Sequence, residues 1–333
     1  MDIKEILKKR KAPVMEKVME FVGDGDPALL YDMMREYPNR PGKGLRPALV
    51  MIATEAYGRD ASQSIITAAA LELFQNWVLI HDDIEDGSDE RRGKPCLHHM
   101  HGIPLAINAG DALHIKMWEA LDRNSEVMGD EKDKAIKAKM AEMLSRTVEG
   151  QTMELMWTHN NDWDVSEEDY YTMIYKKTCW YTVIAPIQFG ALIAGAGNLQ
   201  AIHDFGVALG KAFQLQDDIL NLVADEKYGK EIAGDIYEGK RTLILIHLMK
   251  NCSPEEKKKV LAVMNKERED KTEKEVQYVL GLMKEKGSID YAVKAAKGFA
   301  DKAKELFPTL NVPDGPASEE LKAIVDYIIE RKL

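Results

Sequence analysis

Apolar residues recur at three- and four-residue spacing through almost the whole chain, and this periodicity constrains the fold more than any other feature. Such spacing predicts amphipathic helices, whereas strands would show strict alternation of apolar and polar residues. Helix-start signals occur at residues 166–169 (SEED) and 253–256 (SPEE), and Gly287-Ser288 indicates a stop followed by a new start. No Gly/Ser-rich linker divides the 333 residues. We therefore expect one all-helical domain over residues 1–333.

The charge balance and the cysteines restrict the function. The chain carries 45 Lys+Arg against 56 Asp+Glu, a formal net charge of -11, which argues against general nucleic-acid binding. Three widely spaced cysteines (Cys96, Cys179 and Cys252) do not suit a disulfide framework or structural zinc site, and they favour a cytoplasmic location. We expect no signal peptide and no membrane span, because no apolar run approaches about 18 residues.

The strongest candidate site begins where an apolar stretch, residues 71–80, runs into Asp82, Asp83 and Asp86. Residues four apart on a helix share a face, so Asp82 and Asp86 present carboxylates with Cβ atoms about 5–6 Å apart. Asp83 is rotated by about 100° and can only flank that pair. Two carboxylates this close repel unless a cation lies between them, and such hard oxygen ligands suit Mg²⁺. A solvated helix end is the alternative for this cluster alone.

A second acidic cluster follows a similar apolar stretch, at Asp217 and Asp218. Its i+4 position holds Asn221, a weaker metal ligand than aspartate, so we expect this cluster to hold its cation chiefly through Asp217. Two acidic ends on apolar helices predict a cavity with metal on two of its walls.

Basic clusters alternate with these acidic ones. Arginine binds phosphate oxygens bidentately, and lysine acts as a point charge. Any one basic cluster by itself is ordinary solvated surface, but the set predicts sites for two diphosphates, one bridged through metal and one held by cations alone. The members are Lys43 and Arg46, Arg91, Arg92 and Lys94, Lys176 and Lys177, and Lys230, Lys240 and Arg241.

In this order the motifs resemble those of the trans-isoprenyl diphosphate synthase, or polyprenyl synthetase, family. The matches are GKGLRP (42–47), LIHDDIEDGSDERRGKP (79–95), GQTME (150–154), KKT (176–178), FQLQDDILN (213–221) and GKEIAGDIYEGKRT (229–242). They lie within about residues 40–245, and residues 253–333 are expected to be packing helices. The last motif resembles archaeal short-chain enzymes, such as geranylgeranyl diphosphate synthases. The resemblance implies an isoprenoid-synthase-type bundle of long helices around a deep central cavity, usually as a homodimer.

The resemblance also implies roles for individual residues. Two or three Mg²⁺ ions would be held by Asp82, Asp86 and Asp217, with Asp83 and Asp218 as further candidates. An allylic diphosphate would contact Arg91, Lys177, Lys230 and Lys240. Isopentenyl diphosphate would contact Lys43, Arg46, Gln75 and Arg92. The reaction centre would be lined by Lys177, Thr178, Tyr181 and Gln214, with Gln151 and Glu154 near the metals. This chain departs from the family pattern at Gln75, Asn221 and Gly44.

The implied reaction is head-to-tail condensation by ionisation, condensation and elimination, which needs no His or Cys nucleophile. We interpret His81 as a structural residue and expect His98, His99 and His101 to lie in a loop. Below Asp82, Trp77 and Phe74 would form a floor that limits the product to C15 or C20, and C20 is favoured. Ordinary core packing is the alternative for these two rings.

Two other functions share some of these features. A class I terpene cyclase would carry an NSE-type second metal motif and lack a site for isopentenyl diphosphate, whereas this chain has Asp217-Asp218 together with Lys43 and Arg46. A non-catalytic subunit of a heteromeric prenyl synthase is expected to lose acidic ligands, and Asp82, Asp86 and Asp217 are all present.

Overall fold

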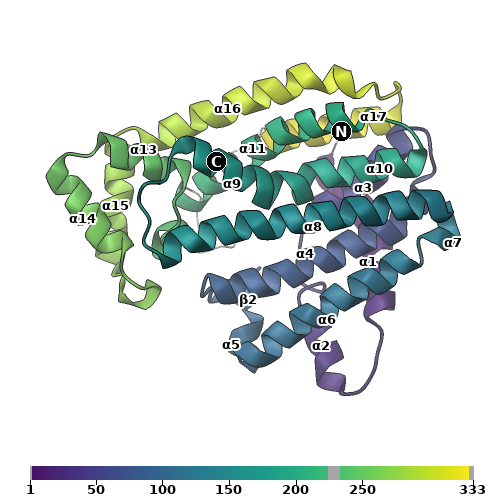
Figure 1. Ribbon diagram of the computed structural model, residues 1–333, viewed down its shortest axis with the longest axis horizontal. Coiled ribbons are helices and arrows are strands. Elements are labelled where there is room, and N and C mark those ends of the chain that lie inside the picture. Colours follow the sequence, from purple (N-terminus) through teal and green to yellow (C-terminus); the bar gives the residue numbers. More distant parts are fainter. Residues whose placement is uncertain (1, 224–232, 330–333) are drawn as a thin grey trace. The chain divides into compact units, whose positions relative to one another are not determined.

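The computed structural model describes residues 2–223 and 233–329, and in these ranges the chain is almost entirely helical (Figure 1). The all-helical class expected from the periodicity is therefore confirmed. Up to residue 128 the elements are α1 (Ile3–Val22), α2 (Ala28–Glu36), α3 (Leu45–Ala56), α4 (Ile65–Glu85), β1 (Glu90–Arg91), β2 (Lys94–Pro95), α5 (Leu97–His101), α6 (Ile103–Asp122) and α7 (Ser125–Met128).

The remaining elements begin with α8 (Asp130–His159), the longest helix. After α8 come α9 (Glu167–Ile174), a π-helix (Tyr175–Ile184), α10 (Ala185–Ala194), α11 (Leu199–Val223), α12 (Gly234–Tyr237), α13 (Leu243–Asn251), α14 (Pro254–Met264), α15 (Glu273–Glu285), α16 (Ser288–Leu306) and α17 (Pro316–Ile329). Short 3₁₀ turns lie at Ala61–Ser64, Arg268–Asp270 and Phe307–Leu310.

These helices form two compact units, each made of segments that are distant in sequence. The first unit consists of Met1–Leu144, Tyr181–Gly206 and Leu306–Tyr327, and the second consists of Ser145–Trp180, Val207–Glu305 and Ile328–Leu333. The helix α8, the π-helix and α11 contribute residues to both units. The expectation of a single domain stays a prediction.

In the first unit, α4 packs along α6 and α3 packs along α10 (Figure 1). The helix α4 is buried continuously from Thr67 to Asn76, as its apolar sequence requires. Glycines allow the close approach of both pairs. A Cβ atom on Gly110 of α6 would lie 2.4 Å from the His81 ring, and one on Gly190 of α10 would lie 2.5 Å from Ala53. Since neither glycine carries a Cβ atom, α6 can approach α4 and α10 can approach α3 more closely than larger residues would allow.

The second unit has its own apolar core, to which α9, α11, α13, α14 and α15 contribute buried side chains. Its helices begin where the sequence predicts. Ser166 and Ser253 each form a complete capping box with the acidic residue three positions later. The helix α16 begins at Ser288, directly after Gly287 with φ 66°. These start signals are confirmed.

Residues 87–104, expected to be an irregular break, contain regular structure. The strands β1 and β2 form an antiparallel hairpin in which Arg91 pairs with Lys94. Its two turn residues, Arg92 and Gly93, both have positive φ (55° and 74°), as a tight two-residue hairpin turn requires. The next residues form α5, so the prediction that His98, His99 and His101 lie in a loop was wrong. The buried Leu97 side chain in the first turn of α5 explains why this short segment is ordered.

Candidate active site

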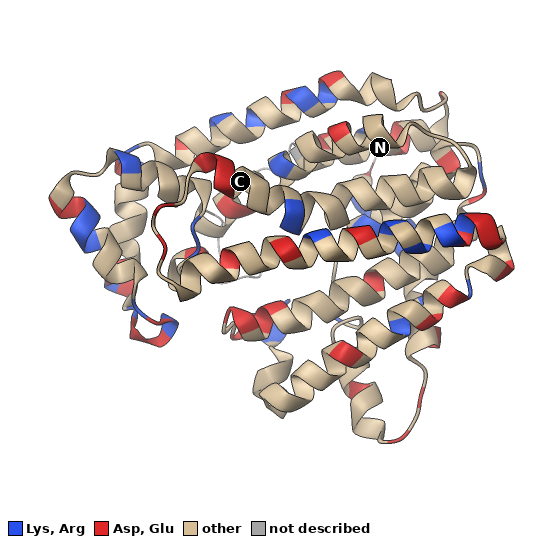
Figure 2. Cartoon of the chain, in the orientation of Figure 1, with Lys and Arg blue, Asp and Glu red and all other residues tan. Residues whose placement is uncertain are grey.

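The first acidic cluster forms the last turn of α4. Acidic residues, red in Figure 2, follow one another at this end of the helix. Asp82 and Asp86 are each partly exposed, and the Asp86 N–H donates to the Asp82 carbonyl at 2.8 Å, which closes the final helical turn. The two side chains therefore leave the helix on the same face, as their spacing predicts.

Asp83 lies on a different side of α4 and is completely buried. Its Oδ1 accepts a hydrogen bond from Arg91 Nε at 2.7 Å and a second, very short one from the same guanidinium, while its Oδ2 accepts from the Tyr37 hydroxyl. Burial acts to lower the pKa of Arg91, but the adjacent Asp83 more than offsets this, and the net pKa is raised. Asp83 is therefore a fully buried partner of Arg91, whereas Asp82, whose Oδ2 lies 3.6 Å from the same guanidinium, is partly exposed, as is Asp86.

The donor set at this helix end suits a hard divalent cation. Within the part of the chain that the structure describes, no three His, Cys, Asp or Glu side chains are grouped closely enough to hold an ion by themselves. Two partly exposed carboxylates, Asp82 and Asp86, nevertheless match Mg²⁺. This ion is usually bound through one or two carboxylates and takes its other ligands from water and substrate phosphates.

A cationic cluster lies elsewhere in the first unit. The turn at Arg92 directs its guanidinium toward Gly42, where an added Cβ would lie only 3.0 Å away. Lys11 of α1 donates to the Gly42 carbonyl at 3.0 Å. Burial lowers the pKa of both Lys11 and Arg92. An excess of partly desolvated cations is the charge distribution that a bound anion would stabilise.

Glu72 of α4 is the buried counter-charge of this cluster. Burial raises its pKa, whereas Arg92, Lys11 and Arg46 act to lower it. Gln75 lies one turn further along α4 and is also buried, and its Oε1 makes no hydrogen bond. The buried Nε of Arg46 likewise makes none, which leaves a donor available for a ligand.

Arg46 is oriented by the part of the π-helix that belongs to the first unit. Its guanidinium lies 4.3 Å from the centre of the Tyr181 ring and donates to Thr182 Oγ1 at 2.9 Å. The Tyr181 ring in turn contacts Phe74 edge-on, with centroids 5.7 Å apart. The structure thus brings Arg46, Tyr181 and Phe74 together. Lys43 is exposed, with its ammonium 5.9 Å from the Tyr327 ring centre.

Trp77 packs toward α6. It stacks on His114 with ring centroids 4.1 Å apart and contacts Phe74 edge-on at 5.7 Å. His81 also contacts α6, where its Nε2 lies 3.2 Å from the Ile107 carbonyl oxygen. These contacts fit the structural role expected for His81.

The second acidic cluster lies near the end of α11, in the second unit. Asp218 is buried, and its two oxygens accept from Tyr170 Oη at 2.6 Å and from Gln214 Nε2 at 2.8 Å. Burial raises the pKa of Asp218 to about 6. Gln214 Oε1 accepts a hydrogen bond from Thr178 Oγ1 at 2.7 Å, so two residues expected at the reaction centre are in direct contact. Asp217, one residue earlier, is partly exposed.

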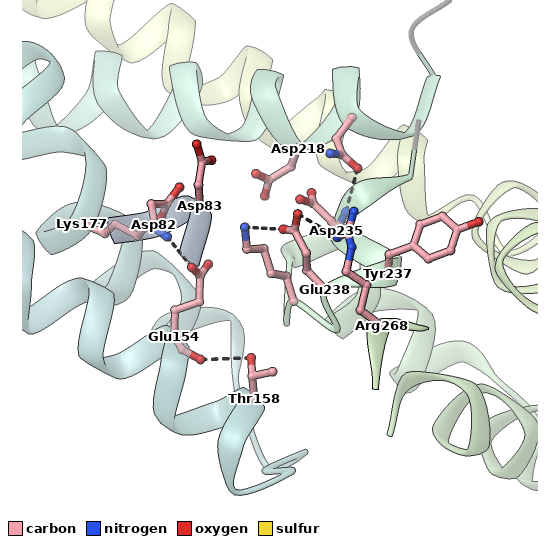
Figure 3. A network of polar contacts seen from close by, with 12 residues as sticks. Asp82, Asp83, Glu154, Thr158, Lys177, Asp218, Asp235, Tyr237, Glu238 and Arg268 are labelled. Carbon is pink, nitrogen blue, oxygen red and sulfur yellow. Dashed lines mark hydrogen bonds and ion pairs between the residues drawn. The ribbon is translucent and has the colours of Figure 1, made fainter. Parts of the chain in front are cut away.

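Lys177 forms an ion pair with Glu154 of α8 (Figure 3). Glycine allows this arrangement, because a Cβ on Gly150 would lie 2.2 Å from the Lys177 backbone nitrogen. On the other side of this segment, a Cβ on Gly210 of α11 would lie 2.7 Å from the Cys179 Cα. The π-helix therefore passes Gly150 and Gly210 at backbone distance, which explains the glycine in the GQTME motif.

Two further basic residues, Lys240 and Lys230, were expected near this cluster. Lys240 pairs with Glu238 at 2.6 Å. Lys230 lies outside the described residues. Asn221, expected to be a poor metal ligand, uses its side-chain oxygen to accept from the Asp235 N–H at 3.1 Å, and its carbonyl accepts from the Ala233 N–H. Asn221 therefore holds the chain segment that enters α12.

Four side chains of these clusters were missed by sequence reasoning: Glu72, Lys11, Tyr37 and Tyr170. Glu72 could have been identified from the sequence, since it is the one acidic residue within the apolar run of residues 71–80. No sequence pattern identifies the other three, because their neighbours in space come from distant parts of the sequence.

The sequence profile of the polyprenyl synthetase family matches residues 27–283. The chain belongs to this family. It is therefore a prenyltransferase, and the family and enzyme class expected from its motifs are confirmed.

Relatives and solved structures of this family match the whole length of the chain. A short chain isoprenyl diphosphate synthase of Methanothermobacter thermautotrophicus is 33% identical over 100% of this chain and 99% of its own. The crystal structure of a geranylgeranyl pyrophosphate synthetase from Pyrococcus horikoshii has a TM-score of 0.87 at 35% identity, covering 99% of this chain and 98% of the other. A polyprenyl synthase from Caulobacter crescentus, solved with calcium and isoprenyl diphosphate, has a TM-score of 0.86 at 27% identity, covering 100% and 98%.

Across the described ranges, no helix of this prenyltransferase is both long and apolar enough to cross a membrane.

Proposed function

We propose that this polyprenyl synthetase is a short-chain trans-prenyltransferase that condenses isopentenyl diphosphate with an allylic diphosphate, with geranylgeranyl diphosphate (C20) as product. The observation that carries the proposal is the presence of two clusters of opposite charge. Partly exposed carboxylates, Asp82 and Asp86, lie at the end of α4, whereas Arg92 and Lys11 surround Gly42 with positive charge. One substrate would be bound through metal and the other by cations alone.

The reaction breaks the allylic C–O bond, and the diphosphate leaves with the electron pair. Asp82, Asp86 and Asp217 would hold Mg²⁺, which would neutralise negative charge on the diphosphate and so make it a better leaving group. Arg91, Lys177, Lys230 and Lys240 would add positive charge where negative charge develops. In the structure, Arg91, Lys177 and Lys240 are paired with carboxylates, so these cations are already held in place by the chain.

The allylic cation is attacked by the alkene of isopentenyl diphosphate, which forms the new C–C bond. Lys43, Arg46, Gln75 and Arg92 would bind the diphosphate of that second substrate. The hydroxyl of Thr178 and the amide oxygen of Gln214 would stabilise the cation through their dipoles. A proton is then lost to the departed diphosphate, and the products are the longer allylic diphosphate and free diphosphate. Water must be excluded meanwhile, because it would trap the cation.

The product length, the oligomeric state and the location of the enzyme are finer points of this proposal. The C20 product is supported by the Pyrococcus horikoshii relative, a geranylgeranyl pyrophosphate synthetase, together with the bulky rings of Phe74 and Trp77 below Asp82. We propose a cytoplasmic homodimer that uses two or three Mg²⁺ ions. Three free cysteines support the location, and exposed apolar side chains on α6 support the dimer.

A radiolabelled condensation assay tests this function. We expect the wild-type protein, given Mg²⁺, isopentenyl diphosphate and farnesyl diphosphate, to form a C20 diphosphate. Asp82→Ala should lower kcat/KM by a factor of about 10³ or more, because charge stabilisation of the leaving group is lost, with little change in Tm. Asp111→Ala, which removes an exposed carboxylate on α6, is the matched control and should retain wild-type activity.

Three outcomes would contradict the proposal. No elongated product from the wild type would reject the synthase. A hydrocarbon product instead of a diphosphate would favour a class I terpene cyclase. Activity that appears only after another prenyl synthase subunit is added would favour a non-catalytic partner subunit.

A further inference from the structure

The two Asp-Asp-Ile sequences, at residues 82–84 and 217–219, share a feature that their spacing does not reveal. The second aspartate of each accepts a hydrogen bond from a buried tyrosine on another helix. Tyr37, at the end of α2, donates to Asp83 Oδ2, and Tyr170 of α9 donates to Asp218 Oδ2 at 2.6 Å. Both tyrosines are only 1% exposed. Each pair lies within one of the two units.

The match extends to the other carboxylate oxygen. Asp83 Oδ1 accepts from Arg91 Nε at 2.7 Å, and Asp218 Oδ1 accepts from Gln214 Nε2 at 2.8 Å. In both units, therefore, one oxygen binds a buried tyrosine and the other accepts from a side chain of the proposed active site, Arg91 at the allylic diphosphate and Gln214 at the reaction centre. Tyr37 Oη also accepts from the Leu97 N–H at 3.2 Å, which connects the pair to the start of α5.

Because both aspartates lie on one helix, the buried hydrogen bond between Tyr37 and Asp83 also affects the orientation of Asp82. Consecutive side chains of an α-helix project about 100° apart, so holding Asp83 in place also sets the direction in which the Cα–Cβ bond of Asp82 leaves the helix. This constraint matters because Asp82 lies in the last turn of α4, which ends at Glu85, and terminal turns fray. The same angular relation holds for Asp217 and Asp218 within α11.

We propose that Tyr37 and Tyr170 are positioning residues. Each holds the buried second aspartate of its motif, and thereby orients the first aspartate toward a metal-bound diphosphate. Asp83 and Asp218 are then assigned to this buried role and not to metal binding. The inference rests on the proposed function, because it assumes that Asp82 and Asp217 bind the metal.

Tyr37→Phe and Tyr170→Phe test the inference, since each removes only one hydroxyl. The structure offers a matched control in each unit. Tyr57→Phe removes a hydroxyl that donates to the Leu310 carbonyl at 3.0 Å, and Tyr291→Phe removes one that donates to Glu167 at 2.7 Å. All four variants lose one tyrosine hydroxyl, but only the first two lose a bond to an Asp-Asp-Ile sequence; Tyr37→Phe also loses the bond from the Leu97 N–H.

Two measurements separate positioning from general stability. The first is the Mg²⁺ concentration that gives half-maximal activity. We expect it to rise about tenfold in Tyr37→Phe and Tyr170→Phe, as for other residues that orient metal ligands, with kcat lowered and the KM for isopentenyl diphosphate unchanged. The second needs no turnover: the rise in Tm on adding Mg²⁺ with inorganic diphosphate should be smaller in these two variants than in the wild type or the controls.

The proposal is overturned if Tyr37→Phe and Tyr170→Phe keep the wild-type Mg²⁺ dependence and the wild-type Tm response, whatever their unliganded Tm. That result would leave the proposed function intact, because the wild type would still make product. Conversely, an inactive wild type would reject the function while the Tm response to Mg²⁺ and diphosphate still tests the positioning. If a phenylalanine variant fails to fold, Asp83→Asn and Asp218→Asn serve as second variants, for which the same weakened Mg²⁺ response is expected.

Discussion

Glu72 shows how one residue can control the charge of a whole cluster. Its carboxylate is fully buried on α4, and its charge opposes those of Lys11, Arg46 and Arg92. The cluster nevertheless has more cations than anions. This imbalance is costly in the free protein and would be relieved by a bound diphosphate.

We predict that Glu72→Gln lowers the free energy of unfolding by roughly 3 kcal/mol, because buried cations lose their compensating charge. Inorganic diphosphate should raise the Tm of this variant by more than it raises that of the wild type. Denaturant unfolding and thermal shift measure the two effects.

Glu142→Gln is the control, since Glu142 forms a partly exposed pair with Lys139 on α8, and pairs near the surface contribute about 0–1 kcal/mol. Equal stability losses in the two variants would contradict the importance assigned to Glu72.

At the scale of elements, two capping boxes fix the start of helices in the second unit. Ser253 and Glu256 begin α14, and Thr272 and Glu275 begin α15. Hydrogen bonds from Lys286 and from the Ser253 N–H lower the pKa of Glu256 to about 2. Hydrogen bonds from Lys266 and from the Thr272 N–H lower the pKa of Glu275 to about 2 as well.

The lowered pKa values give these boxes a defined pH dependence. A carboxylate with a lowered pKa in the folded state stabilises the fold fully above its ordinary pKa, here 4.5. That contribution is lost as the pH falls from about 4.5 to about 2. We predict that Glu256→Gln lowers Tm at pH 7 and that its difference from the wild type vanishes near pH 2.

Thermal melts across this pH range measure the effect. Glu305→Gln removes an exposed carboxylate that pairs with Lys302 near the end of α16. Its Tm should differ less from that of the wild type at every pH. A difference for Glu256→Gln that persists unchanged at pH 2 would contradict the prediction. Ser253→Ala, which removes the other side chain of this capping box, should cost about 1 kcal/mol.

At the scale of the whole molecule, product length depends on which side chains limit the space below Asp82. Phe74 contacts Tyr181, whereas Trp77 stacks on His114 of α6. We predict that Trp77→Ala lengthens the product beyond that of the wild type, because removing the indole leaves space for further five-carbon units.

Chromatography of the dephosphorylated products measures this length. Phe205→Ala is the control, as it removes a buried ring of the same unit that packs on Phe307. Both variants are expected to lose a few kcal/mol of stability, typical of large-to-small core changes, but only Trp77→Ala should change the product. An unchanged product would place the floor at other residues.

Association of two copies is a second property at this scale. The helix α6 exposes Ile103, Leu105, Ile107 and Ile115, and Ile115 is 59% exposed. Apolar side chains repeated along one helix indicate a protein-binding surface. We predict a homodimer in sedimentation experiments, and Ile115→Lys should shift it toward monomer. Lys116→Ala, at the adjacent position on α6, should leave the dimer intact, and a wild-type monomer would contradict the prediction.

The sequence predicted the local geometry of these segments, because that geometry depends on residues that are close in sequence. The face shared by Asp82 and Asp86 follows from helix periodicity alone, and the start signals at Ser166 and Ser253 need only the next three residues. Asn221 illustrates the limit. Its sequence position suggests a weak metal ligand, but its side chain accepts from the Asp235 N–H, fourteen residues away.

The sequence by itself determined the all-helical class, the family and the two acidic motifs, since each is encoded by periodicity or by an uninterrupted string of residues. Only the tertiary structure distinguished Asp83 from Asp82 and Asp218 from Asp217. Neighbouring aspartates are chemically identical in the sequence. Their environments differ because Tyr37 and Tyr170, which are 46 and 48 residues away along the chain, reach only one member of each pair. Burial and hydrogen bonding of this kind arise from packing between distant segments, and no local pattern records them.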